Sequence, residues 1–191
     1  MEAADWDARY AATQRVWAAA PNQFVAAELS ELPPGRALDL AAGEGRNAIW
    51  LAERGWQVTA IDFSAVAIER GRSSGGGVDW VVGDVATHLL PSAVDLVLIS
   101  YLQLPKPEMV PIWRRAFAAV RPGGTFFVIS HDSSNLDRGV GGPQDPNCLH
   151  TAADVIEALE DVEFEMVKAD CVARQTETGT AFDALVRLVR R

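Results

Sequence analysis

The sequence predicts an α/β fold: a Rossmann-like, seven-stranded, mostly parallel sheet with helices on both faces and an antiparallel C-terminal hairpin strand. Short apolar runs alternate with helical patterns between residues 37 and 130, which is typical of βαβ units. A turn containing glycine joins the first apolar run to the helical pattern that follows it. Near the end of the chain, two strand-like runs flank the short link Glu177-Thr178-Gly179, and this spacing favours a hairpin.

The predicted elements follow from the position of apolar runs and of capping residues. Strands are expected over 37–42, 58–62, 78–84, 94–101 and 125–130, with the hairpin strands over 164–174 and 180–189. Helical patterns end near Arg54, Arg72 and Val120. Ser64 is placed to cap the second of these helices, and a capping box at 151–154 begins a short helix that reaches about Leu159.

Residues 1–35 are expected to form an N-terminal helical flap. Trp6, Tyr10 and Trp17 share one stripe of a helix, where they either pack on the core or close over a bound ligand. Asn22 is a suitable N-cap for a second helix over 23–32. The whole chain, 1–191, is the length of one domain.

The segment 132–150 is a long loop rich in glycine and proline. Connections longer than about 12–15 residues without secondary structure are uncommon and often serve as lids or binding loops. We therefore expect this loop to act as a lid.

Charge and composition exclude several classes of protein. The 17 Lys and Arg residues face 26 Asp and Glu residues, so the net charge is −9, which disfavours a broad nucleic-acid groove. Apolar runs are far shorter than a membrane span, and residues 1–9 lack the pattern of a secretory signal. The two cysteines and three widely spaced histidines do not form a metal site. We expect a cytoplasmic protein without nucleic-acid or membrane partners; its oligomeric state stays open.

The most informative stretch is the turn after the first strand. Gly43-x-Gly45-x-x-Ala48 fits the dinucleotide-binding pattern, and Asp62 ends the second strand, where a carboxylate accepts hydrogen bonds from ribose hydroxyls. An NAD(P)-dependent oxidoreductase is therefore one interpretation.

Acidic residues around this turn favour a different ligand. Asp39 lies at the end of the first strand, Glu44 lies inside the turn, and Asp84 closes the third strand. Negative charge at these places opposes a pyrophosphate but suits a cationic nucleoside without phosphate. S-adenosylmethionine is such a molecule, with a sulfonium, an ammonium, a ribose and an adenine.

The motifs LDLAAGEGRN, VTAIDFS, VVGDV, VDLVLISYLQL and RPGGTFFVISHD together resemble the class I S-adenosylmethionine-dependent methyltransferases. Among these, the chain is most similar to small-molecule members of the tellurite-resistance and thiopurine methyltransferase type. The resemblance implies that Asp39, Gly43 and Gly45 hold the methionine part, Asp62 the ribose, and Asp84 with Val85 the adenine. The family's usual glycine is replaced by Ala41 in this turn.

The resemblance implies a larger set of cofactor-binding residues, which includes neighbours in the turn and residues at strand ends. They are Asp39, Ala41, Gly43, Gly45, Arg46, Asn47, Asp62, Phe63, Ser64, Asp84, Val85 and Ser100. Phe63 is expected against the adenine ring. Arg46 is expected to pair either with the cofactor carboxylate or with Glu44 or Asp39.

Methyl transfer from a sulfonium requires mainly positioning, because the activation resides in the cofactor. The predicted reaction transfers a methyl group to a small-molecule thiol, heteroatom or metalloid and leaves S-adenosylhomocysteine. His131 and Tyr101 are the candidate catalytic residues: His131 as a general base, a pocket-lining residue or a structural turn residue, and Tyr101 as a wall of the site rather than a proton carrier. Trp6, Tyr10, Trp17, Gln103 and Asp132 are the candidate substrate or lid residues. A regulator that binds S-adenosylmethionine without catalysis is the remaining alternative.

Overall fold

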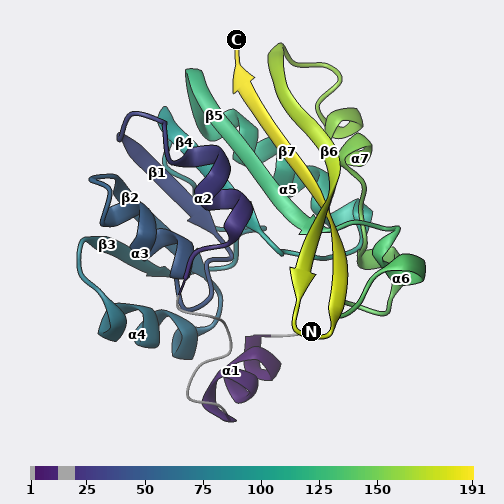
Figure 1. Ribbon diagram of the computed structural model, residues 1–191. Coiled ribbons are helices and arrows are strands. Elements are labelled where there is room, and N and C mark those ends of the chain that lie inside the picture. The colour runs from purple at the N-terminus through teal and green to yellow at the C-terminus, as the bar shows by residue number, and fades with distance from the viewer. Residues whose placement is uncertain (1–2, 13–19) are drawn as a thin grey trace. The chain divides into compact units, whose positions relative to one another are not determined.

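A computed structural model describes residues 3–12 and 20–191 of the chain (Figure 1). The strand order is β3-β2-β1-β4-β5-β7-β6, and β7 runs antiparallel to both β5 and β6. This mixed, seven-stranded sheet with its helices confirms the predicted fold class. The chain divides into two compact units, residues 1–89 and 90–191, which are described in turn.

In its described residues, 3–12 and 20–89, the first unit contains three parallel strands and four helices. Its elements are α1 (Ala3–Ala12), α2 (Gln23–Leu29), β1 (Arg36–Leu40), α3 (Arg46–Ala52), β2 (Gln57–Asp62), α4 (Ala65–Ser74) and β3 (Val78–Val82). In the ladder, Leu40 is opposite Ile61, and Asp62 is opposite Val82. The carboxyl ends of all three strands therefore lie at one edge of this part of the sheet.

Helix caps in this unit follow the sequence prediction. The side chain of Asn22 accepts hydrogen bonds from the backbone N–H groups of Phe24 and Val25, and Ser64 Oγ accepts one from Ala67. Both caps satisfy donors that a helix leaves unpaired in its first turn.

The second unit contains the other four strands. Its elements are β4 (Val94–Ser100), α5 (Lys106–Ala119), β5 (Val120–His131), α6 (Asn135–Arg138), a 3₁₀ turn (Pro146–Cys148), α7 (Ala152–Ala158), β6 (Phe164–Thr176) and β7 (Gly179–Arg190). Thr151 and Asp154 form the predicted capping box of α7, and β6 and β7 form the predicted hairpin.

Two boundaries in this unit differ from the prediction. β5 begins at Val120 and not at Thr125, and its register against β4 shifts between Val94 and Leu96. Gly123, with φ of +76°, allows the chain to bend there while the ladder continues. The loop 132–150 also contains α6 and the 3₁₀ turn, which its glycines and prolines did not indicate.

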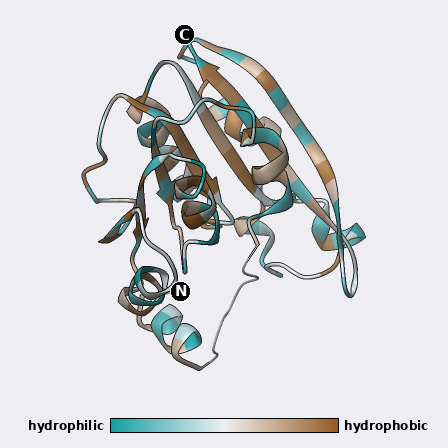
Figure 2. Ribbon diagram, turned by 60° about the vertical axis from the view of Figure 1, so that its left-hand side comes forward, coloured by the Kyte–Doolittle hydropathy of each residue, from teal (hydrophilic) through white to brown (hydrophobic). Residues whose placement is uncertain are grey.

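The strands carry the apolar residues of the core, as the brown ribbons of Figure 2 show. Phe126 and Phe127 of β5 are fully buried, and Phe117 of α5 meets Phe126 edge to face, with ring centroids 5.6 Å apart. Among the described residues, no helix is long and apolar enough to span a membrane.

Trp80 of β3 packs against two glycines in the first unit. A Cβ atom on Gly71 of α4 would lie 2.4 Å from the indole, and one on Gly45 would lie 2.1 Å from it. Both positions therefore need glycine in order to leave room for the indole.

We expect Gly71→Ala to lower the free energy of unfolding by about 1–3 kcal/mol, because the new methyl group overpacks the site of Trp80. Urea unfolding monitored by circular dichroism measures this change. Gly76→Ala is the matched control, since no atom lies within 4 Å of its added Cβ, and its stability should stay the same or rise by up to about 1 kcal/mol. Equal stability of the two variants would contradict this packing.

Candidate functional site

The turn between β1 and α3 has an unusual backbone. Ala41, Gly43 and Gly45 all have positive φ, at 57°, 58° and 75°. For alanine this conformation costs roughly 1–2 kcal/mol, whereas glycine adopts it freely. Ala41, at the position where the resemblance implies a glycine, thus bears local strain that glycine would relieve.

Asp62 connects this turn to the next strand end. The backbone N–H of Gly43 donates to its Oδ2 at 2.8 Å, and the N–H of Ser64 donates to its Oδ1 at 2.9 Å. The side chain is only 5% exposed. Burial raises the pKa of Asp62, while the two backbone hydrogen bonds act in the opposite direction.

Asp39 is the most unusual charged group of the site. It is 1% exposed, and neither carboxylate oxygen has a hydrogen-bond partner within ordinary geometry among the described residues. Burial, and next the charge of Asp62, raise the pKa of Asp39 to about 7, against the opposing effects of Arg46 and of the Ala48 backbone N–H. A buried carboxylate without a partner is costly, so this group is prepared for a ligand that supplies a cation or donors.

Other acidic and polar residues of the turn have partners. Glu44 pairs with Arg70 of α4 at 3.2 Å, a partner that the sequence did not indicate. Asn47 is buried and its Oδ1 accepts a hydrogen bond from the backbone N–H of Asn22 at 2.9 Å. Asn47 therefore anchors the start of α2, and a cofactor contact by Asn47 stays a prediction.

Helix α1, which is part of the predicted flap, contacts this site through the side chain of Asp7. Asp7 of α1 accepts hydrogen bonds from Ser64 Oγ at 2.5 Å and from the Val66 N–H at 3.3 Å. Tyr10 is buried, and Trp6 lies against it with ring centroids 5.7 Å apart. Trp17, the third aromatic residue of the predicted stripe, lies outside the described residues.

The predicted adenine-side residues follow β2 and β3. Phe63 is half-buried and Val85 is buried, whereas Asp84 is exposed. The Oδ1 of Asp84 accepts the Ala86 N–H at 2.9 Å, as in a common turn cap. Its other oxygen leaves capacity for a donor from a ligand.

The remaining predicted residues lie in the second unit. Ser100 ends β4, and Gln103 donates from Nε2 to the Cys148 carbonyl at 3.3 Å. Asp132 is buried and accepts the Ser134 N–H at 2.9 Å. Gln103 and Asp132 thus organise the 132–150 loop.

Tyr101 and His131 both lie beside the buried Asp183, which was not among the predicted site residues; His131 Nδ1 makes no hydrogen bond to it. The Tyr101 hydroxyl donates to Asp183 Oδ2 at 2.9 Å, and His131 Nδ1 lies 3.4 Å from Asp183 Oδ1. Arg174 Nε also donates to Asp183 Oδ2, at 2.6 Å. The two hairpin strands were predicted, but the contact of Arg174 with Asp183 depends on the register of the hairpin.

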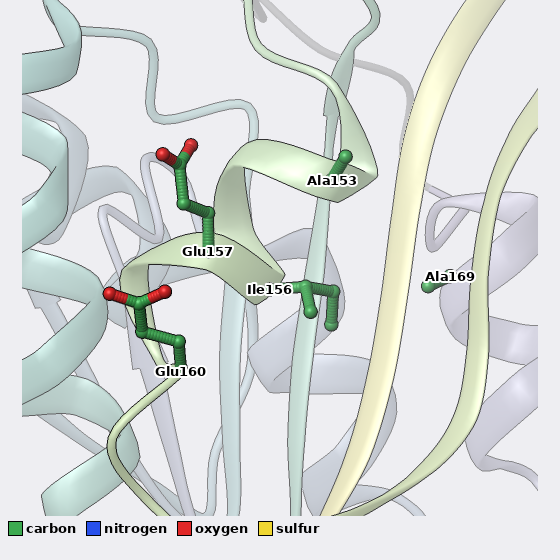
Figure 3. Close-up of a pocket in the computed structure, with 5 residues that line it drawn as sticks. All are labelled: Ala153, Ile156, Glu157, Glu160 and Ala169. Atoms are coloured by element: carbon green, nitrogen blue, oxygen red, sulfur yellow. The ribbon is translucent and has the colours of Figure 1, made fainter.

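The second unit also has two hollows. One, of about 490 Å³, lies between α7 and β6, where Ile156 points toward Ala169 and the carboxylates of Glu157 and Glu160 point away (Figure 3). The other, of about 460 Å³, is lined by the segment after β4 and by the end of the 132–150 loop, including Lys106, Asp145 and His150. None of the predicted site residues lines either hollow.

Comparison with known proteins shows which protein family part of the chain is similar to. Residues 37–124 match a family model described as a methyltransferase domain. The chain is 31% identical over 123 residues to a tRNA 5-carboxymethoxyuridine methyltransferase of Escherichia coli, a match that covers 56% of this chain and 45% of that relative. The chain thus spans about half the length of the curated relatives it matches.

Two solved structures share the fold. TehB from Haemophilus influenzae has a TM-score of 0.74 at 16% identity, covering 90% of this chain and 63% of that one. Magnesium protoporphyrin IX methyltransferase from Synechocystis, solved with bound S-adenosylmethionine, has a TM-score of 0.67 at 16% identity, covering 99% and 79%. At these identities the two structures show a shared fold, and residues 37–124 are similar to the methyltransferase-domain family, in agreement with the predicted class.

The buried carboxylate of Asp39 leads to a prediction for the protein without ligand. A carboxyl group whose pKa is higher in the folded than in the unfolded chain binds more protons when folded, so stability decreases as pH rises from about 4 to 7. Asp39→Asn should make this decrease shallower and raise the free energy of unfolding at pH 8 by about 1 kcal/mol or more.

Urea unfolding at pH 5 and pH 8 measures both effects. Asp79→Asn, on an exposed position of β3, is the matched control and should reproduce the wild-type slope. An Asp39→Asn protein that is less stable than wild type at pH 8 would show that the carboxylate has a stabilising partner.

Proposed function

We propose that this protein transfers a methyl group from S-adenosylmethionine to a small-molecule acceptor and releases S-adenosylhomocysteine. The observation that carries this proposal is the pair of buried carboxylates, Asp39 and Asp62, at neighbouring strand ends beside the turn after β1. The match of residues 37–124 to a methyltransferase domain supports it independently.

The residues of the first unit fit this cofactor. Asp39, which lacks a hydrogen-bond partner, suits the ammonium of the methionine part, and the charge of Arg46 suits its carboxylate. Asp62 keeps lone pairs for the two ribose hydroxyls beyond its backbone hydrogen bonds. Asp84 and Val85 would receive the adenine. When bound, the cofactor supplies an activated methyl group on a sulfonium.

The same charges disfavour a nicotinamide dinucleotide. Its pyrophosphate would bring two negative charges to a turn beside two buried carboxylates. The cations among the described residues of α3 and α4 are Arg46 and the already paired Arg70 and Arg72. In addition, the room left by Gly45 is filled by Trp80. The dinucleotide pattern of the sequence is therefore better explained by packing and by turn geometry.

The acceptor that we propose is a small molecule of the kind used by the tellurite-resistance and thiopurine methyltransferase type. Likeness to the fold of TehB supports this type, and the net charge of −9 opposes a polyanionic substrate such as tRNA. The relative from Escherichia coli is named for a tRNA substrate, so the assay below includes tRNA. Action in the cytoplasm is part of the same proposal.

Titration calorimetry with S-adenosylmethionine tests the cofactor site. Asp62→Ala should weaken binding 10- to 100-fold, because charge-assisted hydrogen bonds worth roughly 1.5–3 kcal/mol are lost. Asp39→Asn, expected to fold at least as well as wild type, should weaken it as well, whereas Asp79→Asn should not change the affinity.

The alternatives give different results in the same experiment. Micromolar binding of NADH without binding of S-adenosylmethionine would overturn the proposal in favour of an oxidoreductase. Binding of S-adenosylmethionine without methyl transfer to any of the thiols, phenols, amines, metalloid oxyanions or tRNA offered with labelled cofactor would favour a regulator. Transfer to tRNA alone would overturn the small-molecule acceptor.

A further inference from the structure

β6 is the edge strand of the second unit. It is 13 residues long and stands last in the strand order, next to β7 (Figure 1). Its pairing with β7 is regular from Lys168 to Thr176, and a bulge between Met166 and Lys168 precedes this run. A long edge strand leaves a row of backbone N–H and C=O groups to which another strand can bind.

Hydrogen bonds of β7 show which backbone groups of β6 point outward. The Phe182 carbonyl accepts the Asp132 N–H at 2.9 Å, and the Phe182 N–H donates to Asn135 Oδ1 at 2.7 Å. Both backbone groups of Phe182 are therefore used away from β6, so its partner Ala173 is in a non-hydrogen-bonded pair. Because such pairs alternate along an antiparallel ladder, every second residue of the run has its backbone groups directed away from β7. These residues are Ala169, Cys171, Ala173 and Gln175.

The outward-facing residues leave this edge accessible. Cys171, Ala173 and Gln175 are exposed, and Ala169 is half-buried. Within residues 3–12 and 20–191, no hydrogen bond to their backbone groups occurs at this edge. Proline, which would block pairing, does not occur between residues 168 and 176. This stretch of β6 can therefore accept a further strand.

The charges of β6 indicate that the strand that fits is a second β6. Asp170, Val172 and Arg174 lie on the same face, because they are two residues apart. When two β6 strands pair antiparallel with Val172 at the centre, Asp170 of each copy lies opposite Arg174 of the other. Every residue from Lys168 to Thr176 then has a partner, and opposite charges across a sheet are stabilising.

Other registers are less favourable. A centre one residue closer to the bulge puts Lys168 opposite Arg174, and a centre two residues closer puts Asp170 opposite itself. Like charges directly opposite each other are destabilising. Centres shifted toward the hairpin loop leave Lys168 and Ala169 unpaired and separate Asp170 from Arg174. The sequence of β6 is therefore self-complementary at one register.

We propose that β6 is a homodimer interface, at which the β6 strands of two copies of this chain pair antiparallel about a two-fold axis at Val172. Ala169 then forms a hydrogen-bonded pair with Gln175 of the second copy. Cys171 pairs with Ala173 in the same way, whereas Val172 faces its own counterpart in a non-hydrogen-bonded pair. The same surface is used by both copies, so the assembly closes at two.

Arg174 is already oriented for its contact with the second copy. Asp183 accepts hydrogen bonds from its Nε at 2.6 Å and from its Nη2 at 3.3 Å, and the Arg174 side chain is still 21% exposed. A guanidinium has five N–H donors, so these two bonds leave capacity for the carboxylate of Asp170 from the second copy.

The hollow between α7 and β6 gives room for the second copy. Ala169 lines this hollow together with Ile156, and the carboxylates of Glu157 and Glu160 point away from it (Figure 3). In the proposed register, Gln175 of the second copy lies beside Ala169 on the same face of the sheet. Its side chain therefore enters the hollow without meeting a charge.

Sedimentation velocity of the full chain at micromolar concentrations measures the dimer. The wild type should sediment as a dimer that dissociates on dilution. Ala173→Pro should raise the dissociation constant of the dimer at least about 10-fold, because it removes an N–H that bonds to the second copy twice per dimer. This N–H is not used in the pairing with β7, so circular dichroism should show an unchanged fold.

Asp170→Lys tests the register. It places a lysine opposite Arg174 of the second copy at two places in the dimer, so the dissociation constant should rise at least about 10-fold. Asp79→Lys makes the same change of charge on an exposed position of β3, the strand at the other end of the order, and should leave the dissociation constant unchanged. Equal dissociation constants for the wild type and Asp170→Lys would overturn the proposal.

A cysteine at the two-fold axis gives a second readout. With Cys148 and Cys171 both replaced by serine, Val172→Cys should form a disulfide between two copies on mild oxidation, because the opposed Cα atoms lie about 4.5 Å apart. Gln175→Cys in the same background is the matched control. That position is more exposed, but its two copies lie about 20 Å apart in the dimer and should not cross-link. A wild type that is monomeric across the micromolar range, or faster cross-linking of Gln175→Cys than of Val172→Cys, would contradict the proposed interface.

Discussion

Two backbone hydrogen bonds to Asp62 hold together the region on which the first unit's site depends. Through them, a single carboxylate fixes the turn after β1, at Gly43, and the start of α4, at Ser64. Ser64 in turn receives α1 through Asp7. The geometry of the turn, the position of α4 and the docking of the N-terminal helix are therefore all linked to one side chain, which must be buried in order to accept both bonds.

The buried charge of Asp62 makes ionisation of a neighbouring buried acid, Asp39, less favourable. Asp39 lies on the adjacent strand, where its carboxylate oxygens have no hydrogen-bond partner of ordinary geometry among the described residues. The charge of Asp62 is the second largest cause of its raised pKa, after burial. Such a cost persists in a folded protein when function requires it, since activity commonly opposes stability at binding sites. A ligand with an ammonium group removes the cost when it binds, so binding and stability are coupled at Asp39.

The sequence was sufficient to predict the parts of the fold that depend on local signals. The helix caps at Asn22, Ser64 and Thr151 and the terminal hairpin all follow from nearby residues. The packing of Trp80 on Gly45 was not predictable in this way, because it joins β3 to a turn 35 positions earlier in the chain. The partner of Asp183 was equally hidden, since a shift of one residue in strand register moves every side chain to the other face.

Two of the buried acids, Asp39 in the first unit and Asp183 in the second, differ in how their charges are matched. Asp39 has no hydrogen-bond partner among the described residues, whereas Asp183 has an arginine and a tyrosine hydroxyl as donors and a histidine beside it. An acid whose charge is unmatched attracts a cation, while an acid whose charge is already matched can only orient its neighbours. Asp39 is therefore the group of the first unit that favours a cationic ligand, whereas Asp183 holds Tyr101 and Arg174 of the second unit in place.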